Sequence, residues 1–201
     1  MPRVANHGLR RRQVAEALLR VVAEGGLDAA SLPRVAAEAG TSVGLIQRYF
    51  RSKDDLLEFA FDHLYSRTLE RLAAVGPADS VREGLARGLA VLLPLDEERV
   101  REGRMLLAYM ARASVNPRLA RPHIEGTLEI RRLTAAALRQ AERDGEVAPG
   151  IDPEREAIAL AAYVDGLAVH MLSAPGSLTP STARSLLDSY LNRLFTGRSH
   201  G

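Results

Sequence analysis

Apolar residues recur at helical spacing along almost the whole chain, and this periodicity narrows the folds that the chain can adopt. Val14, Leu18 and Val22 fall on one face of a helix, and Gly25-Gly26 can end that helix in a left-handed conformation. No convincing run of alternating β-branched residues indicates a strand. The sequence therefore predicts an all-α fold.

Glycine, proline and hydroxyl-bearing residues divide this pattern into about nine helices. Ser31, then Thr41 or Ser42, and then Ser52 can each cap the first turn of a helix. The helix that follows Ser52 is expected to continue to about Val75. Five longer helices are expected after it, over residues 79–93, 96–114, 117–144 and 153–173 and in the apolar stripe 183–195.

The N-terminal part is basic, although the chain as a whole is nearly neutral. Residues 1–53 hold nine Arg or Lys against four acids, a balance of +5, so the remaining 148 residues carry −3 of the net +2. A basic end on a mildly acidic body is typical of a protein that meets a polyanion, although ordinary solvated charge gives the same asymmetry. Charge and helix length together predict an N-terminal domain of residues 1–53 and a C-terminal domain of residues 54–201, with the fourth helix crossing between them.

The absence of cysteine excludes disulfides and thiolate metal sites, and it fits a reducing compartment. The N-terminus lacks the apolar stretch of a secretory signal, and the most apolar run, residues 157–164, ends at Asp165 well short of a membrane span. We therefore expect a cytoplasmic protein with no membrane partner and no metal or other cofactor.

Residues 31–50 have the layout of a helix-turn-helix, in which the second helix lies in the DNA major groove. Ala36 is small where the two helices approach each other, and Gly40 can take the positive φ that the turn needs. Ile46 and Phe50 lie one turn apart and form an inward face. The opposite face of this helix is therefore expected to meet the bases.

The residues on that outer face can read base edges. Arg48 can donate two hydrogen bonds to guanine, and Gln47 can pair bidentately with adenine. Val43 and Leu45 can contact a thymine methyl group. The expected DNA-contacting set is Ser31, Ser42, Val43, Gly44, Leu45, Gln47, Arg48, Tyr49 and Lys53.

Lys53 is the only lysine in a chain that otherwise uses arginine for its positive charge. It stands at the start of a helix, where exposed backbone amides also favour an anion, so we expect it to hold a DNA phosphate. Ser31 and Tyr49 are expected to contact flanking phosphates as well. The alternative is that Lys53 is an ordinary surface lysine.

Residues 10–60 resemble the TetR/AcrR family of one-component bacterial regulators. The resemblance rests on Ala36, Gly40, Ser42, Tyr49, Phe50, Ser52, Lys53, Asp54 and Leu56. Within the family, the run GLIQRYFRSKDDLLE looks most similar to the betaine-synthesis (BetI-like) repressors. Many relatives carry tyrosine where this chain has Gln47, so their base readout should not be transferred to it. The resemblance implies a ligand-responsive repressor that binds a pseudo-palindromic operator as a homodimer and is released by a small-molecule effector.

Dimerisation is expected through the last two helices, because their apolar surface is wider than one small body needs to bury. The expected interface comprises Leu167, Met171, Leu187, Tyr190, Leu191 and Leu194. The alternative is that both helices belong only to the core of a single chain.

An effector cavity is expected among the C-terminal helices, where polar or polarisable side chains interrupt apolar walls. The candidates are Met105, Tyr109, Met110, His123, Tyr163, Asp165 and His170. Each can equally be a core or surface residue. Aromatic residues make up only 4% of the chain and tryptophan is absent, which disfavours an aromatic cage for a quaternary ammonium effector.

Two other classes of function compete with this one. An all-helical enzyme is disfavoured because the five histidines are dispersed and the chain has no His-Glu-x-x-His motif, phosphate-binding glycine loop or nucleophile elbow. A DNA-binding protein without a small-molecule effector, such as an architectural protein, stays an alternative. Equal affinity for its own promoter and for random duplex would favour the architectural protein.

Overall fold

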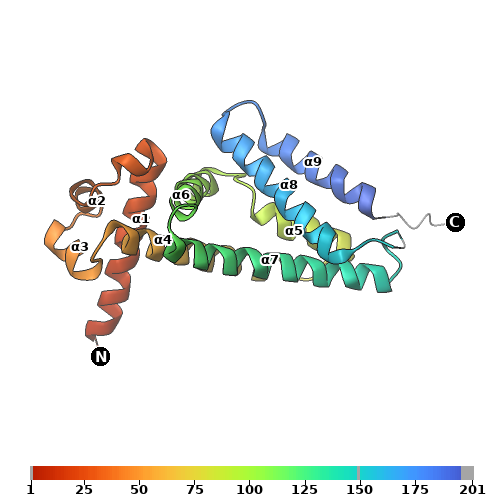
Figure 1. Ribbon diagram of the computed structural model, residues 1–201, viewed down its shortest axis with the longest axis horizontal. Coiled ribbons are helices and arrows are strands. Elements are labelled where there is room, and N and C mark those ends of the chain that lie inside the picture. The colour runs from red at the N-terminus through yellow and green to blue at the C-terminus, as the bar shows by residue number, and fades with distance from the viewer. Residues whose placement is uncertain (1, 149, 196–201) are drawn as a thin grey trace. The chain divides into compact units, whose positions relative to one another are not determined.

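The computed structural model describes residues 2–148 and 150–195, and this part of the chain forms nine helices (Figure 1). They are α1 (Pro2–Ala29), α2 (Leu32–Glu38), α3 (Val43–Tyr49), α4 (Lys53–Ala73), α5 (Val81–Val91), α6 (Glu97–Ala113), α7 (Pro117–Arg143), α8 (Pro153–Ser173) and α9 (Pro180–Leu194). Within the described residues the only β-type pairing is an isolated antiparallel bridge between Val147 and Phe195. The predicted all-α fold is confirmed.

The predicted start and stop signals act where the sequence places them. Gly26 has a φ of 70° and interrupts the helical geometry of α1 close to its end. Ser42 accepts a hydrogen bond from the Leu45 amide at 3.2 Å, and Ser52 accepts one from the Asp55 amide at 3.1 Å. These hydroxyls satisfy amides that have no partner within the helix, so the helix starts are local properties of the sequence.

The packing divides the chain into two compact units. Residues 1–67 and 97–123 form the N-terminal unit, and residues 68–96 and 124–201 form the C-terminal unit. This division differs from the predicted boundary after residue 53, because α6 returns to pack along α1 and the first two-thirds of α4 complete the same core. Only the last turns of α4 belong to the C-terminal unit.

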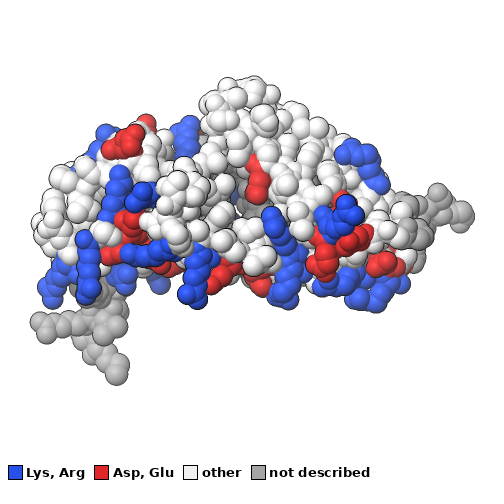
Figure 2. All heavy atoms as spheres, in the orientation of Figure 1, with Lys and Arg blue, Asp and Glu red and all other residues white. Residues whose placement is uncertain are grey.

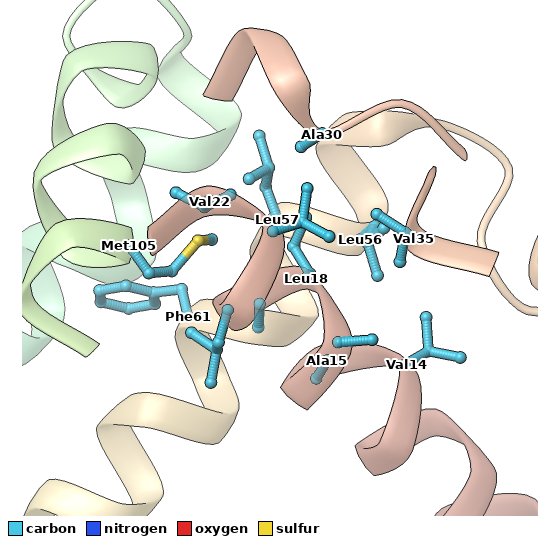
Figure 3. Packing of buried hydrophobic residues seen from close by; sticks show 14 of the residues in the cluster. Val14, Ala15, Leu18, Val22, Ala30, Val35, Leu56, Leu57, Phe61 and Met105 are labelled. Atoms are coloured by element: carbon cyan, nitrogen blue, oxygen red, sulfur yellow. The ribbon is translucent and has the colours of Figure 1, made fainter. Parts of the chain in front are cut away.

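The N-terminal unit has one core to which α1, α2, α4 and α6 all contribute. Figure 3 shows Leu18, Val35, Leu57, Phe61 and Met105 converging from these helices. Each of these five side chains is at most 5% exposed. Burial of this kind stabilises a fold by about 1.5–3 kcal/mol for each large apolar side chain. This core therefore fixes α2, and with it the helix-turn-helix, on α1 and α4.

The C-terminal unit has a separate core made by α5, α7, α8 and α9. Leu89, Leu138, Leu160 and Leu187 supply one large side chain each from these four helices, and each is at most 4% exposed. A side-chain contact also joins α5 to α9, since Arg82 donates to Asn192 at 2.8 Å and to Asp188 at 3.2 Å. Aliphatic side chains dominate this core, whereas the N-terminal core is rich in aromatic rings.

Candidate DNA-binding surface and C-terminal cavity

The turn between α2 and α3 has the geometry that a helix-turn-helix requires. Ser31 caps α2, with its hydroxyl oxygen 3.4 Å from the Arg34 amide nitrogen. Gly40 has a φ of 61°, a conformation that glycine adopts without the steric penalty of a β-carbon. The amide of Thr41 donates back to the Ala36 carbonyl at 2.9 Å, which closes the turn. The short α3 helix is thereby held at a fixed angle to α2.

The inner face of α3 is buried as the spacing predicts. Ile46 is 0% exposed, and Phe50, which follows the last residue of α3, is 1% exposed. The Phe50 ring lies 5.5 Å from the ring of Phe59 in α4. These contacts prevent α3 from rotating about its own axis, so its opposite face is turned permanently away from the core.

That opposite face carries the predicted base-reading residues. Gly44, Gln47 and Arg48 are exposed, while Val43 and Leu45 are half-buried at its edges. An ideal β-carbon at Gly44 would meet no atom within 4 Å, so the surface at that point is open. The predicted orientation of α3 agrees with the structure. Contact with DNA stays a prediction.

The expected phosphate-binding residues lie around the same surface. Ser31 and Ser42 are exposed and both serve as helix caps, and Tyr49 is half-buried. Lys53 is more constrained than expected, since its ammonium donates to the Leu27 carbonyl at 2.6 Å. Lys53 thus connects the last turn of α1 to the start of α4. An ammonium has three donors, so two remain for a phosphate.

Arg11 packs against the aromatic rings that hold the inner face of α3, a role that the sequence did not reveal. Its guanidinium lies 5.4 Å from the centre of the Phe50 ring and 4.3 Å from that of Phe59. Both distances are within the range of cation–π attraction. Phe50 and Phe59 stand 39 and 48 positions after Arg11, so no local pattern could have predicted the contact.

Ion pairs neutralise much of the acidic charge of the N-terminal unit. Glu38 pairs with Arg20 at 2.5 Å, and Glu24 pairs with Arg34 at 3.3 Å. Glu16 contacts His63 at 2.7 Å and Arg67 at 3.1 Å. Figure 2 shows basic side chains beside α1 and α3, although others lie over the remaining helices on the same face. Each of these ion pairs also uses a basic side chain, so the balance of +5 over residues 1–53 is unchanged, and this excess of positive charge suits a polyanion.

Two of the predicted effector residues are core residues of the N-terminal unit. Met105 and Tyr109 are both 0% exposed. Tyr109 stacks on Phe61 at 4.3 Å and donates its hydroxyl to the Leu119 carbonyl at 2.8 Å. Burial, together with nearby carboxylates, raises the pKa of Tyr109 to about 12. A satisfied hydroxyl and a filled core leave these side chains no free surface for a ligand.

The other predicted effector residues are dispersed. Met110 is half-buried, and His123 meets Phe61 edge-on at 6.0 Å in the N-terminal unit. Tyr163 donates to the Leu186 carbonyl at 3.3 Å, and Asp165 and His170 are exposed on α8. None of the seven predicted residues lines the cavity of the C-terminal unit.

That cavity lies between the end of α4 with the loop after it, α5 and α7, and its volume is about 420 Å³. Its three walls include Leu72 of α4, Gly84 and Gly88 of α5, and Leu133 and Ala137 of α7. Its size falls within the range of small-molecule sites, which is about 300–1,000 Å³. The sequence pattern did not predict this cavity. The one sequence signal is the pair of glycines one turn apart in a predicted helix, which leaves a helix face without side chains.

The predicted dimer residues separate into two groups. Leu167, Leu187 and Leu191 are buried in the core of the C-terminal unit, so they hold α8 and α9 together within one chain and are not available to a second copy. This corrects their assignment to an interface. Met171, Tyr190 and Leu194 are half-buried. Tyr190 packs on Tyr163 at 4.8 Å and donates to Glu156 at 2.7 Å; burial and this hydrogen bond raise its pKa to about 12.

A different set of apolar side chains is exposed on these two helices. Ile158 is 49% exposed, and Val169 and Leu186 are each 38% exposed. By length and composition α8 could cross a membrane. Within this chain 22% of its apolar stretch is buried, so most of that stretch is not covered by the other helices. The surface over α8 and the start of α9 is mostly uncharged in Figure 2. An apolar face of this kind indicates an interaction site.

Comparisons with known proteins agree with this geometry. Residues 14–60 match the family model described as bacterial regulatory proteins, tetR family, and residues 81–196 match the model described as BetI-type transcriptional repressor, C-terminal. The chain is 32% identical to HTH-type transcriptional regulator BetI 2 of Chromohalobacter salexigens, over 98% of this chain and 93% of that protein.

Two solved structures have the same fold over nearly their whole length. A transcriptional regulator from Rhodococcus sp. Rha1 is 34% identical with a TM-score of 0.83, and the match covers 92% of this chain and 95% of that one. A putative transcriptional regulator from Saccharomonospora viridis, solved in complex with choline, is 23% identical with a TM-score of 0.86, and the match covers 93% and 98%. At that identity the second likeness concerns the fold alone.

Proposed function

Because the chain belongs to the TetR family of bacterial transcriptional regulators, we propose that it represses transcription by binding a pseudo-palindromic operator as a homodimer in the cytoplasm. A small molecule in the C-terminal unit releases it. The observation that carries the proposal is the orientation of α3, whose buried Ile46 and Phe50 turn Gln47 and Arg48 outward.

In this proposal the outer face of α3 reads base edges in the major groove. Arg48 donates two hydrogen bonds to a guanine and Gln47 pairs with an adenine, and each such pair contributes about 1–3 kcal/mol of discrimination. Val43 and Leu45 lie at the edges of the same face, where they meet thymine methyl groups. Ser31, Ser42, Tyr49 and Lys53 surround this face and contact phosphates, which fix the register but carry no sequence information.

The homodimer forms through the exposed apolar face of α8 and α9. Ile158, Val169 and Leu186 belong to this face, and covering them with a second copy removes their surface from water. Asp165 lies on the same face of α8, between Ile158 and Val169. A bilayer is the poorer partner, because a central aspartate costs about 2.5–3.5 kcal/mol in a membrane, whereas a second protein copy can supply the carboxylate with a hydrogen bond. Two-fold symmetry then presents two α3 helices to half-sites about 34 Å apart or a multiple of that.

The cavity of the C-terminal unit supports the response to a ligand. A small molecule that binds one arrangement of the surrounding helices more tightly shifts the population toward that arrangement. The choline in the Saccharomonospora viridis structure is a ligand of a related fold and supports the same kind of regulation here. Operator affinity falls when the favoured arrangement no longer sets both α3 helices in successive grooves.

The experiment that tests the proposal measures binding to the protein's own promoter, to a single half-site and to random duplex over a range of salt concentrations. We expect selective binding to the promoter and much weaker binding to the half-site. Arg48→Ala and Gln47→Ala should each relax the preference at particular bases, whereas Lys53→Ala should weaken all duplexes by similar factors and reduce the salt slope by about 1.

Because Lys53 also contacts the Leu27 carbonyl, circular dichroism should accompany that variant. Equal affinity of the unaltered protein for promoter and random duplex would contradict sequence-specific regulation. Unchanged base preference in both α3 variants would contradict the assignment of the reading face.

A further inference from the structure

The wall of the C-terminal cavity contains no charged side chain and no aromatic ring. Leucine, valine and isoleucine form most of it, together with glycine and alanine, and the polar members are Ser80, Thr134 and Gln140. From this chemistry we infer that the effector is a neutral, mainly aliphatic small molecule and not a quaternary ammonium compound. The inference rests on the proposed regulator function and names the ligand class of its effector site.

The three polar side chains in the wall already have partners within their own segments. Ser80 accepts from the Glu83 amide at 3.1 Å, and Thr134 donates to the Ile130 carbonyl at 2.9 Å. Gln140 donates to Asp144 at 2.7 Å and accepts from Arg143 at 2.5 Å. A charged ligand would lose its hydration without receiving equivalent hydrogen bonds in return, which is unfavourable.

A cation would also lack the two groups that normally hold it. Such ligands bind over aromatic faces or beside carboxylates, but the cavity wall supplies neither. In the described C-terminal unit, Tyr163 and Tyr190 pack on each other at 4.8 Å and Phe195 belongs to the core. The nearby acid on α5, Glu83, pairs with Arg87 at 2.5 Å. The cavity is therefore unsuited to choline-like compounds.

The shape of the cavity favours an aliphatic chain. Gly84 and Gly88 lie one turn apart on α5 and leave a strip of that wall without side chains between Val81, Leu85 and Leu89, and the small Ala137 side chain leaves room at the α7 wall. Ideal β-carbons at Gly84 and Gly88 would stand 3.6 Å from Ala78 and 3.8 Å from Leu72, which is ordinary van der Waals contact, so the two glycines keep these cavity-lining residues close to the α5 backbone. At ~30 Å³ for each water-sized group, the volume accommodates on the order of 14 non-hydrogen atoms.

The test compares n-decanol, an uncharged aliphatic probe, with choline on the full-length protein. Calorimetry should detect saturable decanol binding, and decanol should weaken promoter binding. Choline at a hundredfold higher concentration should do neither. Decanol has eleven non-hydrogen atoms, so the three carbon atoms that Ala137→Leu adds would take up all of the remaining room, and this variant should weaken decanol binding by at least about tenfold.

Ala136→Leu is the matched control, because residue 136 is the exposed neighbour of Ala137 on the same helix. It adds the same side chain outside the cavity and should leave decanol binding unchanged. Gly88→Leu fills the opposite wall and provides a second test if Ala137→Leu does not fold. Circular dichroism and ligand-free promoter binding establish that each variant is folded.

Three outcomes would overturn the inference: saturable choline binding, no decanol binding, or decanol binding that Ala137→Leu and Gly88→Leu leave intact. The failure of the proposed function would look different. In that case the ligand-free protein would not distinguish its promoter from random duplex, whatever decanol does. Selective promoter binding without a decanol response would reject only the ligand class.

Discussion

Different kinds of contact stabilise the interiors of the two compact units of this protein. In the N-terminal unit, aromatic rings stack between helices, as Phe61 does on Tyr109 at 4.3 Å, and Arg67 reaches glutamates on α1 and α6. In the C-terminal unit, aliphatic side chains pack around a cavity of about 420 Å³. The N-terminal unit also has a pocket, of about 470 Å³, but charged side chains such as Glu16, Arg67 and Glu102 line it, whereas the wall of the C-terminal cavity is mainly apolar.

The start and the end of α4 show the same contrast. At its start, Asp54 accepts two hydrogen bonds from Arg112, both at 3.1 Å, and one from Asn116 at 2.8 Å. Toward its end, Leu72 borders the cavity beside Gly88. Directional contacts therefore hold α4 where the helix-turn-helix joins it, whereas near its end Leu72 borders open space that a ligand could fill.

The largest expected difference is in the free energy of unfolding, when one apolar side chain is truncated in each unit. Phe61→Ala removes a ring that is 5% exposed from a filled core, and it should lower the free energy of unfolding by about 3–5 kcal/mol. Leu133→Ala removes a cavity-lining side chain that is 44% exposed, and it should change stability by less than about 0.5 kcal/mol. Urea unfolding at matched protein concentration measures both. Similar losses in the two variants would mean that the cavity region is as tightly packed as the N-terminal core.

Two glycine-to-alanine substitutions, one in each unit, should change the free energy of unfolding in opposite directions. Gly88 lies inside α5 with room for a β-carbon, so Gly88→Ala should raise the free energy of unfolding by about 0.4–1 kcal/mol. Gly40 has a φ of 61°, so Gly40→Ala should lower it by about 1–2 kcal/mol. Thermal unfolding of the two variants would establish the signs. A stabilising Gly40→Ala would show that the turn can relax, which would contradict the fixed geometry of the helix-turn-helix.

Much of the fold was predictable because its signals are local. The helix starts follow from hydroxyl caps such as Ser42, and the outward direction of Arg48 follows from the burial of Ile46 one half-turn away on the same helix. Gly40 takes the positive φ that the turn needs. Each of these features is decided within a few residues, so a single sequence contains the necessary information.

The features that were not predicted depend on segments that meet only in the folded chain. The hydrogen bond from Lys53 to Leu27 spans 26 residues, and the one from Arg104 to Ala23 joins α6 to α1 across 81 residues. Because α6 packs on α1, residues 97–113 belong to the N-terminal unit, which a boundary after residue 53 does not allow for. Tyr109 looked like a ligand contact because the sequence does not reveal that the Leu119 carbonyl satisfies its hydroxyl. The apolar stripe of α9 has one buried face and one exposed face, which the sequence pattern alone does not distinguish.

The smallest expected effect concerns the ion pair at the start of α4. Hydrogen bonds from Arg112 hold the pKa of Asp54 below its ordinary value of 3.8. A lowered folded-state pKa means that ionised Asp54 stabilises the fold above about pH 4 and that this contribution is lost as the pH falls toward the lowered value. Asp54→Asn should therefore be less stable than the unaltered protein at pH 7, and the difference should shrink by pH 3.

Glu129→Gln is the matched control in the C-terminal unit. Glu129 pairs with Arg132 at 2.7 Å within one exposed turn of α7, and hydrogen bonds from Arg132 lower its pKa as well. Exposed pairs of this kind contribute little to stability, so urea midpoints at pH 7 and pH 3 should match those of the unaltered protein. Of these two ion pairs, only the one between Asp54 and Arg112 joins separate helices. Its removal should therefore be the one whose effect on stability depends on pH. Equal behaviour of the two variants would mean that charge does not hold α4 at its start.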